Sequence, residues 1–338
     1  MSGNLAKIPL LLFLLLGFSN AQQRYPVKID SKYGFIDQSG TLVIDAKYDE
    51  VRQFSENKAA VKIDQCWGFI DTKGTQIIPV IFDDCNNYIN NFAAVKSGEF
   101  WGMIDTLGDY LLKPDYTRIH HFSEGLATVE FRQKFSLIPQ RSQFGYVNPQ
   151  GEFALIIKTP DAYRFSDGLA MIKLVKYFFI FPIKEYYGFI NKSGEIALET
   201  NFETVGYFQE GLSLFAHKQK IGYMDHTGTI KIQPVFDEAY PFQDGTARIR
   251  KGNQWGFIKP DGTYIVNPNF EYAMDFSEQV AAIKSNGKWG YINHSGDFII
   301  KPEFISAFNF QNGLAAVTSD SVTGYINKQG EFIWKKSL

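Results

Sequence analysis

The sequence is poor in several features that carry specific functions. It has two cysteines in 338 residues, Cys66 and Cys85, so it can form one intramolecular disulfide at most. It has no excess of one charge, since 34 Lys and Arg stand against 36 Asp and Glu, which leaves no basic face for binding nucleic acid. Yet 45% of its residues are hydrophobic and 21% are charged, which excludes intrinsic disorder.

Long apolar runs are confined to the N-terminus. Lys7 precedes an apolar run over residues 8–16, and the small residues Ser19 and Ala21 fit the cleavage pattern of a secretory signal peptide. An uncleaved anchor is the alternative, but the run is about half the roughly 20 residues that a membrane span needs. We therefore predict a signal peptide over 1–21 and a mature chain over 22–338, without a transmembrane segment, in the periplasm or at the outside of the cell.

Glycine recurs with a period. Nine glycines, mostly preceded by an aromatic residue, are separated by six steps of 34 residues and two of 43: Gly34, Gly68, Gly102, Gly145, Gly188, Gly222, Gly256, Gly290 and Gly324. Each is followed by another glycine six residues later, and five are followed by one 23 residues later. The pattern predicts nine copies of one unit, starting near residues 25, 58, 92, 125, 168, 211, 245, 279 and 313.

Two apolar columns run through the copies. Twenty residues after the first glycine stands an aromatic: Phe54, Tyr88, Phe122, Phe165, Phe208, Phe242, Phe276 and Phe310. Three positions earlier stands a small or branched residue: Val51, Cys85, Ile119, Ala162, Val205, Ala239, Ala273 and Ala307. Because burying each aromatic contributes about 1.5–3 kcal/mol, both columns are predicted to face the core.

The last copy indicates three strands per unit, over residues 314–317, 324–327 and 331–334. The second and third are separated by a turn that closes on a glycine, as from Asn327 to Gly330. A proline ends the third strand in four copies, where pairing should stop: Pro114, Pro234, Pro268 and Pro302. The glycine inside the second strand is predicted to be a slot for an aromatic of the neighbouring unit.

Three segments carry a family resemblance. QWGFI (254–258), KWGYI (288–292) and CWGFI (66–70), with the FSEGLA segment (122–127), resemble the WG repeat, also called the KWG repeat. The resemblance covers about residues 25–334, with Ile221 and Thr323 in place of the aromatic. It implies a β-rich, mostly bacterial protein without an established activity, which favours a binding or scaffold role and supplies no catalytic residues.

For the architecture we predict an all-β chain, an open β-solenoid or superhelix of nine three-stranded antiparallel units. Three strands are few for a propeller blade, nine units exceed the usual four to eight blades, and no unit is split between the termini to fasten a ring. Lys335 and Lys336 beside the last strand would discourage edge pairing in such an array. A closed, propeller-like ring is the alternative.

Two insertions interrupt the period. Both 43-residue steps come from nine extra residues between the first two strands of adjacent units, over 130–145 and 173–188. We expect two long hairpins side by side, the second flanked by Lys173, Lys176, Lys184 and Glu185. The candidate partner-binding residues are Phe131, Phe135, Leu137, Ile138, Tyr177, Phe178, Phe179, Ile180, Phe181 and Tyr186. Alternatively the two hairpins pair and bury these side chains against each other.

Catalytic and metal-binding patterns are missing. A phosphate-binding GxxxxGK followed by Ser or Thr is absent, and five histidines (120, 121, 217, 226 and 294) show no metal-ligand spacing. Carboxylates of the FSEG-like segments recur once per unit, as in solvated turns: Glu124, Asp167, Glu210, Asp244 and Glu278. We therefore expect no enzymatic activity, no cofactor and no metal.

The cysteines leave one alternative open. Cys66 and Cys85 are 19 residues apart, and the spacing predicts adjoining strands of one unit, in a compartment that permits disulfides. Cys85 belongs to the inward column, whereas Cys66 stands in a column of Lys, Gln and Phe, so their side chains are expected to point apart. A disulfide between them is an open alternative, and no histidine nearby would activate either thiol.

These observations favour a secreted, non-catalytic scaffold that binds a protein or a cell-surface polymer through the paired long hairpins. The alternative is a glycan-binding protein or glycan-active enzyme. It would use aromatic grooves between units, lined by exposed rings of Trp67, Trp101, Trp255 and Trp289.

Overall fold

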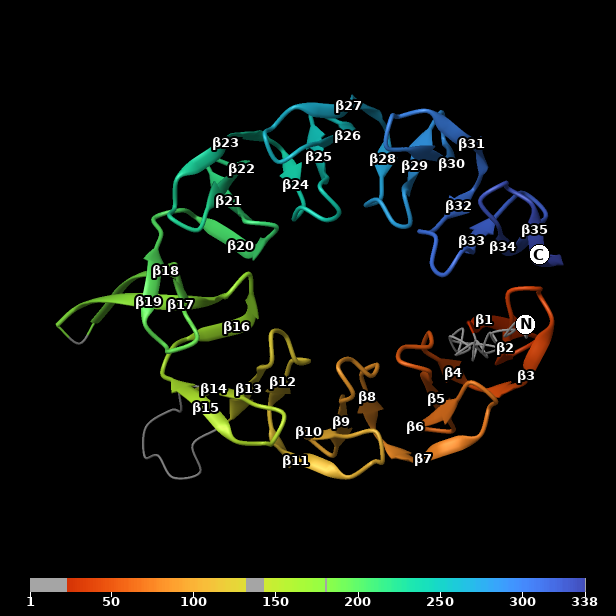
Figure 1. Cartoon of the computed structure of the whole chain (residues 1–338), viewed down its shortest axis with the longest axis horizontal. Helices are drawn as coiled ribbons and strands as arrows, with labels where there is room; N and C mark the ends of the chain where they lie inside the picture. The colour runs from red at the N-terminus through yellow and green to blue at the C-terminus, as the bar shows by residue number, and fades with distance from the viewer. Residues whose placement is uncertain (1–22, 132–142, 180, 338) are drawn as a thin grey trace, which may run out of the picture.

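The structure is a closed ring. It is a computed structural model that describes residues 23–131, 143–179 and 181–337, which form nine small antiparallel sheets around a centre (Figure 1). Each sheet is one blade of a nine-bladed β-propeller. The prediction of an open solenoid is therefore wrong, and so is that of three strands per unit, because eight of the nine blades have four.

The blades follow the chain order. Blade 1 has three strands: β1 (Tyr25–Ile29), β2 (Lys32–Ile36) and β3 (Leu42–Tyr48). Blades 2 to 4 are β4 (Glu50–Val51), β5 (Lys58–Ile63), β6 (Cys66–Asp71), β7 (Gln76–Phe82); β8 (Asp84–Cys85), β9 (Ala93–Ser97), β10 (Phe100–Ile104), β11 (Tyr110–Tyr116); and β12 (Arg118–Ile119), β13 (Ala127–Phe131), β14 (Gln143–Val147), β15 (Phe153–Ile157).

Blades 5 to 7 are β16 (Asp161–Ser166), β17 (Leu169–Phe178), β18 (Phe181–Ile190), β19 (Ile196–Glu199); β20 (Thr204–Gln209), β21 (Leu212–His217), β22 (Lys220–Asp225), β23 (Ile230–Phe236); and β24 (Glu238–Ala239), β25 (Ala247–Lys251), β26 (Gln254–Ile258), β27 (Tyr264–Phe270). Blades 8 and 9 are β28 (Tyr272–Ala273), β29 (Val280–Ser285), β30 (Lys288–Asn293), β31 (Phe298–Phe304); and β32 (Ser306–Ala307), β33 (Ala315–Thr318), β34 (Val322–Ile326), β35 (Phe332–Ser337).

The strand missed by the sequence analysis is the innermost one. In six blades it has two residues, as in β28, too few to show an alternating pattern. A short hairpin follows it, and in blade 9 Asn312 and Gly313 at the turn both have positive φ, as a type I′ turn requires. The 7-residue outer strands lie at the rim, and the innermost strands face the centre (Figure 1).

Both predicted apolar columns are buried. In the aromatic column seven of the eight side chains are buried and Phe54 is half-buried, and in the other column Val51 alone is half-buried. Aromatics of the column pack against the third strand of the preceding blade, as where the rings of Tyr291 on β30 and Phe310 lie 4.8 Å apart. The core is thus a series of layers between blades.

The glycine of the aromatic-Gly pair serves its own blade, so the predicted slot for a neighbouring aromatic is wrong. A Cβ on Gly68 would lie 2.7 Å from the carbonyl oxygen of Pro79, in the outer strand of the same blade. The outer strand bulges toward this glycine. The pairing shows the bulge at Gly102, because Trp101 pairs with Tyr116 while Met103 pairs with Leu112. The absence of a side chain lets the bulged strand approach closely.

The prolines lie within this bulge and do not end the strands as predicted. Pro114 is part of β11, and pairing resumes beyond it at Tyr116. A bulge removes the need for a ladder hydrogen bond at one position, so a residue without an N–H group is tolerated there.

The turn glycine makes the contact between blades. Gly74 has φ 82° and packs against Ile44 of the preceding blade, and Gly108 packs in the same way against Ile78. This contact recurs around the ring and ends with Gly40 of blade 1 against Ile333 of blade 9. Because every unit presents this glycine to its neighbour, the first and last units also meet through it, as a ninth copy of this one contact.

The two cysteines are free thiols in different blades. Cys66 lies half-buried on β6 of blade 2, whereas Cys85 is buried on β8 of blade 3, where burial raises the pKa of its thiol to about 12. The prediction that they belong to one unit is wrong, because the innermost strand belongs to the next blade.

The part of the chain described by the structure contains no helix of the length and apolarity needed to cross a membrane. The predicted signal peptide over 1–21 lies outside the described residues.

Candidate functional site

The hairpin β17–β18 is the feature that departs most from the repeat. Its strands have 10 residues each and project outward from the ring, at the left of Figure 1. In an ordinary blade pairing ends soon after the position of Lys62 and Trp67, which corresponds here to Lys173 and Tyr187. Further pairs continue out to Phe178 and Phe181, so the extension is β-structure, with one shift of register between Lys176 and Tyr177.

The end of this hairpin exposes large apolar side chains. The exposed fractions are 64% for Phe178, 86% for Phe179, 65% for Phe181 and 59% for Ile183. The rings of Phe178 and Phe179 contact each other edge to face, with centroids 4.9 Å apart. Tyr177 is 39% exposed, and Phe179 has φ 53° at the turn. An apolar surface of this kind in a polar surrounding marks an interaction site.

Charged residues lie just behind the apolar end. Lys176 and Lys184 are exposed and directly opposite each other on the two strands. Neither forms an ion pair with another described residue, whereas Lys173, nearer to the ring, is paired with Glu185. Two like charges at opposed positions of a hairpin destabilise it. The arrangement is therefore better suited to binding an anion than to stabilising the strand pair.

The other candidate residues divide into three groups. Tyr186 is half-buried at the base of the β17–β18 hairpin, and burial raises the pKa of its hydroxyl. Phe131 is half-buried at the end of β13, where its ring packs against Tyr116 and Phe153. The remaining candidates, Phe135, Leu137, Ile138 and Ile180, lie outside the described residues. Whether the two long hairpins pair thus stays a prediction.

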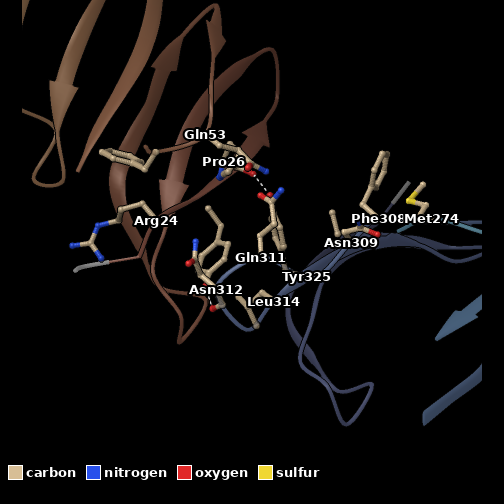
Figure 2. A pocket seen from close by; sticks show the side chains of 13 residues that line it. Arg24, Pro26, Gln53, Met274, Phe308, Asn309, Gln311, Asn312, Leu314 and Tyr325 are labelled. Atoms are coloured by element: carbon tan, nitrogen blue, oxygen red, sulfur yellow. Dashed lines mark hydrogen bonds between the residues drawn. The ribbon is translucent and has the colours of Figure 1, made fainter. Parts of the chain in front are cut away.

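A second candidate lies where the ring closes. A pocket of about 430 Å³ is bordered by blades 1, 2, 8 and 9, with Arg24, Gln53, Met274, Phe308 and Asn309 among its lining residues (Figure 2). Blade 1 has no described innermost strand, and the pocket lies between the inner segments of its two neighbours, near Gln53 and Phe308. The site offers amide groups and an aromatic ring.

Tyr25 shapes this pocket, and the sequence analysis missed it. Its ring lies 5.5 Å from that of Tyr325, and its hydroxyl donates to the carbonyl oxygen of Asn312 at 2.5 Å. The Tyr325 hydroxyl donates to the carbonyl oxygen of Pro26 at 2.9 Å. Burial raises the pKa of Tyr25. The available signal was that Tyr25 stands where all other units have Ala or Ser.

Most of the turn carboxylates link neighbouring blades. The carboxylate of Glu278 accepts a hydrogen bond from the backbone N–H of Gly313, and that of Glu210 accepts one from Gly245, both at 3.0 Å. Glu124 and Asp167 bind Gly168 and Gly211 in the same way. These groups are therefore hydrogen-bond acceptors that recur around the ring and join one blade to the next.

The four tryptophan rings named for the glycan alternative are all partly or fully buried. Trp67 and Trp255 are buried, while Trp101 and Trp289 are half-buried. Trp255 packs between Tyr240 and Tyr272, and the guanidinium of Arg248 lies 5.0 Å from its ring centroid. The exposed rings required by the glycan alternative are absent at these positions.

Two of the histidines stack on aromatic rings of the core. His226 stacks on Phe208 and His294 on Phe276, with ring centroids 4.3 Å and 4.0 Å apart. His120 is partly buried, and burial together with nearby Arg118 lowers its pKa. Within the described ranges, no three or more His, Cys, Asp or Glu side chains lie close enough to hold a metal ion.

Comparison with known proteins identifies the repeat. The profile described as "WG containing repeat" matches residues 33–65, 67–99, 101–135, 144–174, 187–220, 221–255, 255–289 and 289–321. A search of curated proteins finds no match.

Solved structures show what the fold is similar to. A crystal structure of a eukaryotic initiation factor aligns over 94% of this chain and 96% of its own, with a TM-score of 0.65 and 10% identity. Apo AztD from Citrobacter koseri aligns over 94% and 93% with a TM-score of 0.41 and 11% identity. A prolyl endopeptidase aligns over 82% and 49% with a TM-score of 0.43 and 9% identity. At these identities the first likeness supports the propeller fold alone, and the other two carry no argument.

Proposed function

This chain belongs to the WG-containing repeat family, and on that premise we propose that it is a secreted, non-catalytic binding scaffold that recognises a protein or a cell-surface polymer through its long hairpins. The leader-like residues 1–21 support secretion. The propeller supports the scaffold role, because its blades hold projecting segments rigidly at fixed positions on the rim.

One observation carries the proposal. The column aromatics of the repeats, such as Tyr88 and Phe310, are buried between blades, whereas the β17–β18 hairpin brings Phe178, Phe179 and Phe181 together in solvent, each 64–86% exposed. Such exposure costs free energy in the isolated chain and is typical of a surface that becomes covered on binding.

The experiment is affinity capture from periplasmic and cell-surface extracts with two forms of the chain. Deleting residues 175–183 restores the 34-residue spacing and removes the exposed end. We expect a partner that the intact chain captures and the shortened chain does not. The Leu107→Ser variant removes an exposed apolar side chain outside the hairpin and serves as the matched control.

Two checks make the result decisive. The shortened chain must unfold at the same denaturant concentration as the intact chain, so that loss of capture reflects loss of the hairpin. If both chains capture the same partners, the contact does not depend on the β17–β18 hairpin, and the proposal for this hairpin is wrong.

A further inference from the structure

The end of the β17–β18 hairpin carries apolar side chains at its tip and positive charges directly behind them. The outermost described residues are apolar and aromatic, and the next cross-strand pair inward is Lys176 opposite Lys184. Beyond that pair, Lys173 is neutralised by Glu185. The unneutralised positive charge is therefore confined to one level, directly behind the apolar end.

This order matches the layers of a lipid surface. Aromatic side chains prefer the boundary between headgroups and acyl chains, and lysines reach the phosphate level while their stems remain in apolar surroundings. Tyr177 and Phe178 end the strand, and Phe179 follows at the turn. These three residues span about 7–10 Å at 3.4 Å each. An interfacial segment is buried by about 5–10 Å, so the paired lysines would lie at the headgroups when the aromatics are inserted.

The shape of the hairpin also favours a lipid surface over a protein. Five residue pairs beyond Lys173 and Tyr187 extend about 17 Å from the blade. The end is narrow and convex, with two strands and a turn. A specific protein interface buries about 1,200–2,000 Å², which the end of one hairpin supplies only if it enters a deep pocket in the partner. A fluid bilayer requires no such complementary pocket.

We propose that the end of the β17–β18 hairpin inserts into a bilayer that contains anionic lipids, with Phe178, Phe179 and Phe181 in the headgroup–acyl boundary and Lys176 and Lys184 against lipid phosphates. This inference rests on the proposed function only in taking this hairpin as the contact. It replaces an unspecified partner with a lipid surface, and it places the ring of blades at a fixed height above the membrane.

The test is co-sedimentation of the purified chain with vesicles of phosphatidylcholine alone and of phosphatidylcholine mixed with phosphatidylglycerol. We expect binding to the mixed vesicles that weakens as salt is added. The double variant Phe178→Ser with Phe179→Ser should bind at least tenfold more weakly. Lys176→Gln and Lys184→Gln should each weaken binding by about fivefold on anionic vesicles. Leu107→Ser should bind as the parent does.

A second measurement reports insertion without depending on affinity. In the Phe179→Trp variant the new indole should shift its emission to shorter wavelength in the presence of mixed vesicles, and lipids carrying a quencher in the upper acyl chain should quench it. Trp residues of the blades are present in the unsubstituted chain, which gives the baseline for both signals.

The outcomes separate the two proposals. Binding that is equal for the parent and the double Phe variant, or an unshifted emission of the Phe179→Trp variant, overturns the lipid inference. If the shortened chain loses a captured protein while the intact chain does not bind vesicles, the proposed function stands and the lipid surface is wrong. If vesicles are bound through the hairpin and no protein is captured, the lipid surface is the partner.

Discussion

Eight of the nine blade interfaces are built in one way and the ninth in another. At the interface of blades 8 and 9, Tyr291 packs against Phe310 of the next inner segment and its hydroxyl donates to the carbonyl oxygen of Phe308 at 2.8 Å. At the closing interface Tyr325 has the position of Tyr291, but blade 1 has no described inner strand. There Tyr25 supplies the ring, and Pro26 supplies the carbonyl oxygen.

The difference shows how the ring closes when the two ends of the described chain share no blade. The position of Tyr25 is Ala or Ser in every other unit, as at Ala59, because the aromatic of the inner segment occupies the adjacent space. The described part of blade 1 has no such aromatic, and there a large residue, Tyr25, stands in place of the small one. This exchange of side-chain size fills part of the closing interface, beside the pocket of Figure 2.

The largest expected effect follows from removing the substitute ring. Tyr25→Ala should lower the free energy of unfolding by about 3–5 kcal/mol, because it leaves a cavity where a buried aromatic ring packs against Tyr325. Phe276→Ala, in an ordinary interface, should cost a similar amount. Urea denaturation followed by intrinsic fluorescence measures both. A cost below about 1 kcal/mol for Tyr25→Ala alone would mean that the closing interface contributes little.

A smaller effect compares two turn glycines. Gly40 and Gly74 both have φ 82°, a conformation that costs an L-residue about 1–2 kcal/mol. At Gly74 an added Cβ would meet the Ile44 side chain at 3.1 Å, which can shift, whereas at Gly40 it would overlap the backbone carbonyl of Ile333. Gly40→Ala should therefore lower the thermal midpoint more than Gly74→Ala does. Equal shifts would contradict the tight contact between the first and last blades.

Next come the two hydroxyl groups in corresponding positions. Tyr325→Phe and Tyr291→Phe each remove one hydrogen bond to a backbone carbonyl, and each should cost about 1–3 kcal/mol if that carbonyl is left without a partner. We expect equal costs from parallel denaturation curves. A clearly smaller cost for Tyr325→Phe would show that water replaces the hydroxyl beside the closing pocket.

The smallest effect concerns the carboxylates between blades. Glu278→Gln and Glu210→Gln keep the shape of the side chain but weaken the hydrogen bond to the next turn glycine. Because these groups are near the surface, each should cost about 0.5–1 kcal/mol. Differential scanning calorimetry should find the larger cost for Glu278→Gln, because its carboxylate also pairs with Lys328 at 3.3 Å. Its partner Gly313 also adjoins Asn312, the acceptor of the Tyr25 hydroxyl. Equal costs would mean that the link from Glu278 to the closing interface contributes nothing to stability.

The sequence was sufficient for the repeat and for much of its core. The period gave the number of units, and the columns of Phe276 and Ala273 predicted which side chains face the layers between blades. It also located the long hairpin and its aromatic end. These features depend on residues that lie close in sequence or recur at a fixed spacing, so the pattern contains them directly.

The arrangement of the blades could not be read in the same way. Closure depends on the rotation from one blade to the next, which is set by how a glycine such as Gly74 packs on Ile44. The slot assigned to Gly68 was wrong because a bulge in the opposite strand is not visible in the spacing. Tyr25 was overlooked because it is a single large residue at a position that is Ala or Ser in the other units. Its meaning becomes clear only when the space around that position is known.

The closing interface between blades 1 and 9 affects how the ring responds to force. In the described chain no sheet combines strands from both ends. A force applied between β1 and β35 would therefore break side-chain contacts first, before any backbone hydrogen bonds of a sheet. Such a ring should open at low force into a curved array of intact blades. At higher force the blades would then unfold one by one from the two ends. The molecule would thus extend in two stages, first by ring opening and then by unfolding of blades.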